Sequence, residues 1–299
     1  MTRALLIAGP TASGKSALAL ELARRFDAPI LNADSMQVYR DLRVLTARPT
    51  PAEAGMAQHE LFGFVDAAEN FSVGRWLVAA TAVLASAKRV IFVGGSGLYF
   101  KALTQGLSPM PPVAEEIRAA LRMRARGMTS ADLHAELKAR DPQTASRLRS
   151  GDRQRVLRAL EVIDASGRPL ASFHGPRAAP LLAPGEWAGL FLAPDRAALN
   201  GAIDQRFEIM LAQGALAEVA ALAARKLDPA LPAMRAHGAP ALMAHLAGAL
   251  SLAAAAAQAK LETRQYAKRQ FTWARHQMRD FTWVAPPEAS ERGAAVLSA

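Results

Sequence analysis

Gly9-Pro10-Thr11-Ala12-Ser13-Gly14-Lys15-Ser16 decides the fold, because it matches the phosphate-cradling pattern Gly-x4-Gly-Lys-Ser/Thr. The apolar run 4–8 precedes it and a helix-like run, 16–26, follows, which is the strand, loop and helix order that the motif requires. Backbone N–H groups of such a loop point at one anion, and the helix N-terminus adds partial positive charge. We therefore predict that residues 9–16 bind a phosphate or diphosphate, with Lys15 on its terminal oxygens and Ser16 on Mg²⁺.

Composition indicates a globular protein. The chain has 299 residues, of which 51% are hydrophobic, so it can bury a large core. No apolar run approaches the 18 or so residues of a membrane span, and we expect no membrane association. The absence of cysteine is consistent with a reducing cytoplasm, where we expect the protein to act as a monomer.

The net charge of +10 is local. Residues 118–158 contain eleven Lys or Arg against four Asp or Glu, and residues 260–279 contain six against one. Together these excesses of +7 and +5 are larger than the net charge of +10, so the rest of the chain is slightly acidic. Concentrated positive charge attracts polyanions and favours nucleic acid as a partner, although a solvated, arginine-rich helix surface is the alternative.

Apolar runs alternate with helical stretches through the first hundred residues. The runs 4–8, 29–32 and 89–93 are separated by helix-like stretches, which is typical of a parallel sheet with crossover helices. Ligands gather beyond the carboxyl ends of such strands. We therefore expect the glycine loop, Asp34-Ser35 and Gly94-Gly95-Ser96-Gly97 to converge on one site.

Prolines interrupt this rhythm at 109, 111 and 112, and the following arginine-rich stretch contains no strand-like run. Leu190-Phe191-Leu192 indicates a return to the sheet. The sequence thus predicts an α/β fold whose core, residues 1–111 and 188–299, carries a small helical insertion over 112–187.

The acidic residue that could serve chemistry here is Asp34. A motor or switch NTPase usually has a carboxylate at the end of a second apolar strand, but Val90-Ile91-Phe92-Val93 ends in glycines and serine. Asp34, after Ile30-Leu31-Asn32, could instead deprotonate an acceptor while the loop holds a phosphorylated donor. A small-molecule or nucleotide kinase, and a nucleic-acid-binding regulator that merely holds nucleotide, remain alternatives.

Five strings give the chain a resemblance to bacterial tRNA dimethylallyltransferases over nearly its whole length. They are the glycine loop, Asp34-Ser35-Met36-Gln37-Val38-Tyr39-Arg40, Gly94-Gly95-Ser96-Gly97-Leu98-Tyr99, Gln154-Arg155 through Val162, and Thr263-Arg264-Gln265-Tyr266-Ala267-Lys268-Arg269-Gln270. The second and last strings are much more specific than the first. The resemblance implies an adenylate-kinase-like P-loop core and transfer of the isopentenyl unit of dimethylallyl diphosphate to the exocyclic amine of adenosine 37 in tRNA.

The resemblance also implies roles for single residues. Asp34 would be the general base, and Lys15 and Arg264 would stabilise the leaving diphosphate with Mg²⁺ at Ser16. Ser96, which stands where the family mostly has Thr, would also be catalytic, and both it and Asp34 would contact the tRNA. Ser35, Met36 and Gln37 would contact the flipped nucleotide. The residues implied for the anticodon stem-loop are Arg118, Gln154, Arg155, Val156, Leu157 and Arg158.

Overall fold

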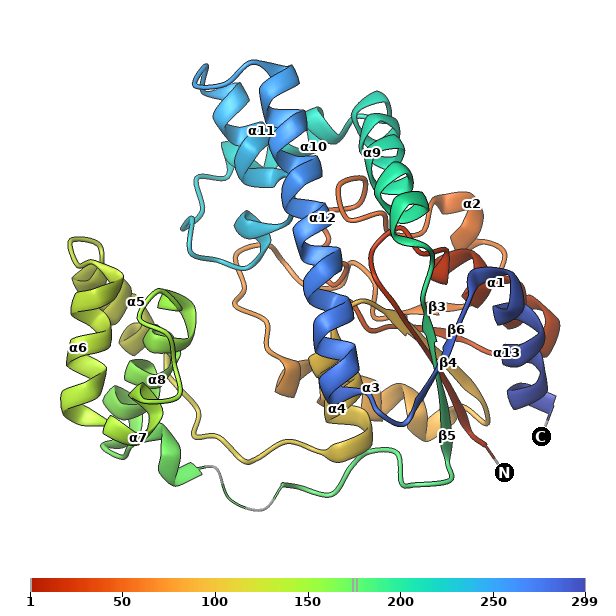
Figure 1. Cartoon of the computed structure of the whole chain (residues 1–299), viewed down its shortest axis with the longest axis horizontal. Helices are drawn as coiled ribbons and strands as arrows, with labels where there is room; N and C mark the ends of the chain where they lie inside the picture. The colour runs from red at the N-terminus through yellow and green to blue at the C-terminus, as the bar shows by residue number, and fades with distance from the viewer. Residues whose placement is uncertain (1, 174, 176, 299) are drawn as a thin grey trace. The chain divides into compact units, whose positions relative to one another are not determined.

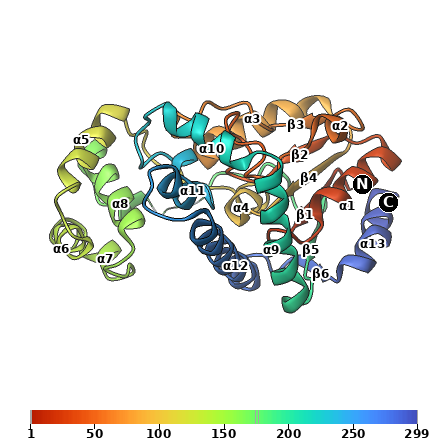
Figure 2. The same ribbon diagram turned by 90° about the horizontal axis from the view of Figure 1, so that it is seen from above.

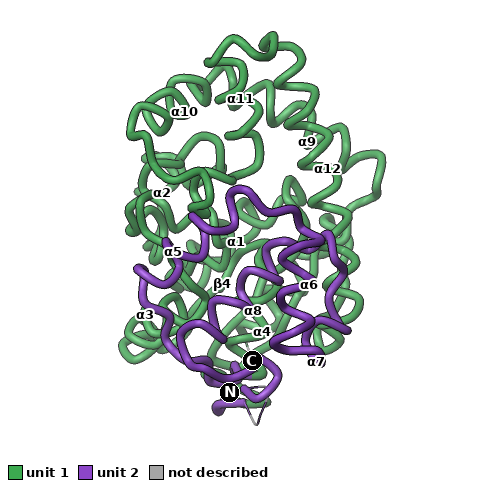
Figure 3. Tube along the Cα trace, turned by 90° about the vertical axis from the view of Figure 1, so that its left-hand side faces the viewer, with its two compact units in different colours: residues 1–105, 180–299 green, residues 106–179 purple. Residues whose placement is uncertain are grey.

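A computed structural model of the chain describes residues 2–173, 175 and 177–298. The chain forms two compact units, coloured separately in Figure 3. The first combines Met1–Gln105 with Pro180–Ala299, and the second is Gly106–Ala179. The inserted unit thus begins and ends several residues before the limits of 112–187 that the sequence suggested.

The first unit is built on a six-stranded parallel sheet with the order β3-β2-β4-β1-β5-β6. The strands are β1 (Ala4–Ala8), β2 (Ile30–Asn32), β3 (His59–Glu60), β4 (Val90–Gly94), β5 (Trp187–Leu192) and β6 (Phe281–Val284). Because helices cover both faces, the central strands are apolar throughout, as parallel strands buried on both sides must be.

Side chains of each strand alternate between two cores. In β1, Leu5 and Ile7 pack with α1 (Lys15–Phe26) and α13 (Ala289–Ser298), which lie side by side in Figures 1 and 2. Leu6 belongs to the larger core on the other face. Helices that supply that larger core include α3 (Val73–Ser86), α4 (Gly97–Gln105), α9 (Arg196–Ala212), α10 (Ala215–Ala224), α11 (Ala239–Leu246) and α12 (Leu252–Gln277).

Short elements complete this unit. They are the helix α2 (Pro51–Ala54) and two 3₁₀ turns, η2 (Ala233–Arg235) and η3 (Pro286–Glu288). Among the described residues, no single helix is both long and apolar enough to cross a membrane; one bent pair, α9 with α10, satisfies length and composition only when both are counted together.

The second unit is helical and has a core of its own. It contains α5 (Glu115–Ala125), α6 (Ser130–Arg140), α7 (Pro142–Ala145), α8 (Arg153–Ser166) and the 3₁₀ turn η1 (Leu170–Phe173). Leu121, Leu133, Leu137 and Leu160 meet in its interior, each at most 2% exposed. Capping side chains start its helices: Thr129 accepts the Asp132 N–H at the start of α6.

Candidate active site

The glycine loop joins β1 to α1 in the shape of an anion cradle. Gly14 stands before the first residue of α1 with φ 87°, and Ala12 also lies in the left-handed region, with φ 63°. Gly9 must lack a side chain, since a Cβ there would lie 2.9 Å from the carbonyl oxygen of Leu192. No side chain of the loop caps the helix, so the N-terminal N–H groups of α1 stay available to an anion.

Two half-buried cations border this cradle. Lys15 Nζ donates to the carbonyl oxygen of Pro10 at 2.5 Å, and the guanidinium of Arg206, on α9, donates to the hydroxyl of Thr11. Burial, and secondarily the positive charge of Arg206, lowers the pKa of Lys15 to about 7. Burial also lowers the pKa of Arg206, an effect that the nearby Asp34 opposes. Within the described part of the chain neither cation forms an ion pair. Their positive charges are therefore available to a bound anion.

Asp34 follows β2 and is oriented by its neighbour Asn32. Asn32 is completely buried; its Oδ1 accepts the Asp34 N–H at 2.8 Å, and its Nδ2 donates to the Asp34 and Leu61 carbonyls at 2.9 and 3.0 Å. Asp34 Oδ1 accepts the Met36 N–H at 2.9 Å. Its other oxygen, Oδ2, lies beside Gly95, where a Cβ would come within 3.3 Å of it. One carboxylate oxygen therefore holds the turn and the other is left for chemistry.

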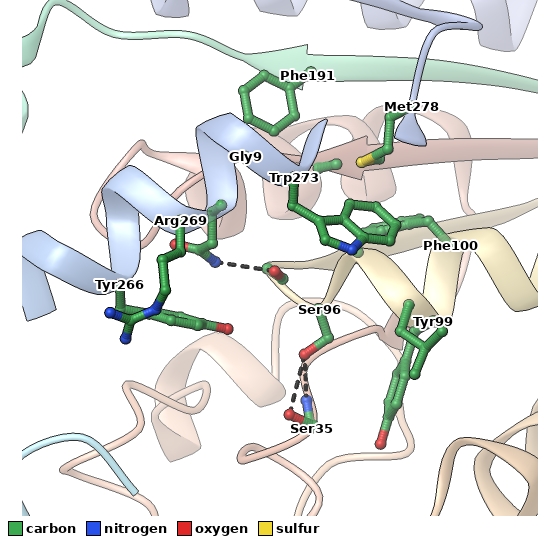
Figure 4. A pocket seen from close by; sticks show the side chains of 15 residues that line it. Gly9, Ser35, Ser96, Tyr99, Phe100, Phe191, Tyr266, Arg269, Trp273 and Met278 are labelled. Atoms are coloured by element: carbon green, nitrogen blue, oxygen red, sulfur yellow. Dashed lines mark hydrogen bonds between the residues drawn. The ribbon is translucent and has the colours of Figure 1, made fainter. Parts of the chain in front are cut away.

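A chain of hydrogen bonds joins the Asp34 turn, the turn after β4 and the glycine loop. The Ser35 N–H donates to Ser96 Oγ at 2.9 Å, and the two hydroxyls lie 3.2 Å apart, as the dashed lines in Figure 4 show. Gln270, buried on α12, accepts the Thr11 N–H and donates to the Gly95 carbonyl, each at 3.0 Å. A Cβ on Gly95 would lie 2.3 Å from this amide, so a side chain at position 95 would displace Gln270 from these hydrogen bonds.

These elements enclose one cavity of about 280 Å³. Its lining brings together Thr11, Lys15, Ser16, Asp34, Ser35, Met36, Gln37 and Arg206. A second cavity, of about 360 Å³, lies next to it and shares Ser35, Gly95, Tyr266 and Gln270 with it. The second is mainly aromatic and apolar: Tyr99, Phe100, Phe191, Trp273 and Met278 surround it (Figure 4).

The loop fits a magnesium ion that arrives with a phosphorylated ligand. Ser16 is exposed and lines the cavity that holds Asp34, so it offers a hard oxygen donor. The described residues contain no group of three His, Asp or Glu that could form a metal cage. Mg²⁺ commonly uses few protein ligands and fills its coordination with phosphate oxygens and water, which is the arrangement these residues permit.

Comparison with known proteins gives the chain a family. The sequence model described as IPP transferase matches residues 37–277. The chain belongs to the IPP transferase family. It is 62% identical over 292 residues to a tRNA dimethylallyltransferase of Rhodopseudomonas palustris (strain BisA53), covering 96% of this chain and 89% of that protein. It is 60% identical over 290 residues to the tRNA dimethylallyltransferase of Methylocella silvestris, covering 96% of each.

Solved structures agree with this membership. The full-length tRNA isopentenylpyrophosphate transferase of Bacillus halodurans superposes with a TM-score of 0.70 and 28% identity, covering 100% of this chain and 97% of the other. The P-loop α/β fold predicted from the sequence is therefore confirmed.

Arg264 lies elsewhere in this IPP transferase than we expected. On α12 it forms an ion pair with Asp204 of α9 at 2.5 Å and does not line the cavity that contains Lys15. Arg206 instead supplies the second cation of the cradle. Its role toward the diphosphate stays a prediction.

The residues implied for tRNA contact in the second unit differ in availability. Gln154 and Arg155 are exposed at the start of α8. Arg118 and Arg158 both flank Glu161, at 3.8 and 3.3 Å. Val156 is completely buried in the unit's core, and Leu157 is half-buried and packs against that core. Contact of the Val156 side chain with tRNA is therefore disfavoured, and contact through Leu157 stays a prediction.

The sequence did not predict three contributors to this site: Asn32, which orients Asp34, Arg206, which borders the cradle, and Gln270, which joins the glycine loop to Gly95. A weak signal exists for Asn32, since an amide inside a short apolar strand must find partners. Nothing in the sequence marks Arg206 among the many arginines of the chain.

Diphosphate binding should take up protons above pH 7. Lys15 has a pKa of about 7 and is mostly neutral at pH 8; a bound anion favours the ammonium form and raises that pKa. At pH 8 we expect uptake of about one proton per diphosphate, and affinity should decline as pH rises further. Calorimetry in buffers of different ionisation enthalpy measures this. The uptake should vanish in Lys15→Ala, and equal uptake by wild type and variant would contradict it.

Proposed function

We propose that this chain transfers the dimethylallyl group of dimethylallyl diphosphate to the exocyclic N6 amine of adenosine 37 in tRNA, next to the anticodon. The observation that carries the proposal is the cavity that combines Lys15, Ser16 and Arg206 with Asp34. In this cavity the groups that bind an anion lie close to a carboxylate oxygen that can accept a proton. Family membership and the names of the relatives support this assignment, and we propose a monomer acting in the cytoplasm, where tRNA is used.

The glycine loop is proposed to hold the diphosphate. As the allylic C–O bond breaks, the bonding pair leaves with the diphosphate, and negative charge grows on it. Lys15, Arg206 and the N–H groups at the start of α1 stabilise that charge most in the transition state, because they are already oriented toward the cradle. Mg²⁺, when bound with Ser16, would neutralise part of the same charge.

Asp34 is proposed to accept the proton of the attacking amine. The N6 lone pair is delocalised into the adenine ring, so the amine attacks well only while a base removes its proton. The new C–N bond forms at the allylic carbon, and the proton moves to Asp34 Oδ2, the oxygen not engaged by the Met36 N–H. Asn32 keeps the carboxylate in place during this step.

A kinase activity is not favoured. β4 ends at Gly94 and leads into Gly95 and Ser96, so no acidic side chain directly follows this strand to organise metal and water. The relatives named above are transferases that act on tRNA.

The experiment that tests the function is transfer itself. The purified chain is incubated with dimethylallyl diphosphate, Mg²⁺ and tRNA lacking the modification, and the digested nucleosides are analysed by mass spectrometry. Isopentenyladenosine should appear in wild type, and a tRNA with another base at position 37 is the matched negative control. Phosphate transfer from ATP without any prenylated nucleoside would favour the kinase alternative and reject ours.

The basic charge is proposed to bind tRNA phosphates. Several exposed cations of the second unit have no ion pair among the residues that the structure describes: Arg126, Lys138, Arg147 and Arg149. We expect the logarithm of the tRNA association constant to fall linearly with the logarithm of the salt concentration, with a slope of roughly 0.7–0.9 for each phosphate contacted. Filter binding between low and moderate salt measures the slope, and a salt-independent affinity would contradict this role.

A further inference from the structure

The turn that follows the Asp34 motif is held by one carboxylate from a distant part of the sequence. Glu218, half-buried on α10, accepts the backbone N–H groups of Arg43, Val44 and Leu45 at 2.6, 2.7 and 2.9 Å. Three successive N–H groups that converge on one point form an anion-binding turn. Here a side chain of the protein is the anion, so the position of Glu218 sets the position of the turn.

This turn is a wall of the proposed active site. Leu45, Thr46 and Ala47 line the cavity that contains Asp34 and Lys15. Ala47 has φ 52°, a conformation that an alanine adopts only when its surroundings impose it. The hydrogen bonds to Glu218 lie two to four residues before Ala47 and are part of those surroundings.

The turn also reaches back to the motif that carries the proposed base. The side-chain amide of Gln37 donates to the carbonyls of Thr46 and Ala47 at 2.8 and 3.1 Å. Gln37 is therefore engaged by the turn rather than free, and its position depends on where residues 46–47 lie. Gln37 comes three residues after Asp34 in a tight turn. Displacement of the cavity wall would therefore also shift Gln37 and the backbone that carries Asp34.

A second tether comes from the end of the same helix. Arg225, seven residues after Glu218 and directly after α10, pairs with Asp41 at 2.5 Å and with Asp66 at 2.7 Å. Seven residues are two helical turns, so both side chains project from one face. Asp41 lies two residues before Arg43, so α10 and the residue after it hold the 41–45 segment at two points.

We propose that Glu218 is a positioning residue for the transfer reaction, holding the 43–45 turn so that Gln37 and the cavity wall accept the adenosine. This inference rests on the proposed function. Glu218 lines a cavity of about 570 Å³ together with Lys15, Ser16 and Arg206, but both of its carboxylate oxygens accept N–H groups of the 43–45 turn. It therefore acts through the turn, whereas the diphosphate is proposed to be held by the glycine loop and by Arg206 on another helix. Loss of Glu218 should therefore impair the acceptor side of the reaction and spare donor binding.

Glu218→Gln separates these effects, because it keeps the side-chain size but loses the charge and replaces one acceptor oxygen with an NH₂ group. At saturating donor and tRNA we expect kcat to fall on the order of tenfold to a hundredfold, as for a small misplacement of reacting groups. The Kd for dimethylallyl diphosphate, measured by calorimetry without tRNA, should stay within about threefold. Glu218→Asp retains the charge and should recover part of kcat. Glu208→Gln, which removes an exposed carboxylate of α9 paired with Lys260, is the matched control.

Hydrogen exchange provides a readout that does not depend on transfer. Amides of residues 43–45 should exchange faster in Glu218→Gln than in wild type or Glu208→Gln, while those of residues 9–16 should not change. Three results for Glu218→Gln would each overturn the inference: unchanged exchange at residues 43–45, a kcat equal to that of wild type, or a loss of donor affinity as large as the loss of kcat. A wild-type chain without transfer activity would instead reject the proposed function, so the two failures are distinguishable.

Discussion

Asp34→Asn is expected to slow the chemical step by about 10²–10⁴-fold, the largest effect of any conservative change in the site. Asn keeps the size of the side chain, and its amide oxygen can still accept the Met36 N–H. The proton acceptor, however, is lost. Single-turnover transfer to tRNA measures the step directly, and both substrate affinities should stay within about tenfold of wild type, since other groups carry the binding.

Asp280→Asn is the control for this prediction, because Asp280 is exposed and does not line the cavity. Near-normal single-turnover transfer by Asp34→Asn would mean that the proton goes elsewhere, for example to the departing diphosphate. Loss of tRNA binding with intact chemistry in the bound complex would make Asp34 a positioning residue instead.

Lys15→Ala should reduce turnover about a hundredfold or more, equivalent to several kcal/mol of transition-state stabilisation. Lys15 lies inside the cradle beside Arg206, and its ammonium form is restored by the anion that binds there. Because charge on the diphosphate grows as the C–O bond breaks, kcat should fall more than donor affinity does. Steady-state kinetics with both substrates varied separates the two quantities.

Arg206→Lys tests the partner cation, since lysine keeps a charge but not the planar fork that reaches the Thr11 hydroxyl. Lys88→Ala removes an exposed lysine between α3 and β4 and should change nothing. Turnover by Lys15→Ala within a few-fold of wild type would show that the glycine loop is not where the leaving group is stabilised.

Elements with strong local patterns were predictable. β1 has the expected bounds and α1 begins one residue before the expected 16–26, because a wholly apolar run, a glycine loop and an amphipathic helix follow one another without ambiguity. β3 was missed, since His59 and Glu60 form a strand only by pairing with Ile30 and Leu31. β6 and α13 were missed as well; two of the four residues of β6 are exposed, so its pattern is weak.

The candidate site was predictable to the extent that it lies in contiguous motifs. The glycine loop, Asp34 and Ser96 occupy the carboxyl ends of β1, β2 and β4, and parallel strands bring those ends together. The choice between Arg264 and Arg206 was not predictable. Both are arginines on C-terminal helices, and the buried face of α9, with Ile203 and Phe207, decides which way Arg206 points.

The sequence by itself determined the chemistry of this protein: a phosphate cradle, a carboxylate after the second strand, and a family whose specific strings recur in order. The tertiary structure alone decided which cations meet the diphosphate, that Gln270 ties the glycine loop to Gly95, and that Glu218 holds the wall behind Gln37. Motif residues are adjacent in the chain and carry their geometry locally. Partners contributed by α9, α10 and α12 come from more than 150 positions away, and only the packing of those helices sets their phase and distance.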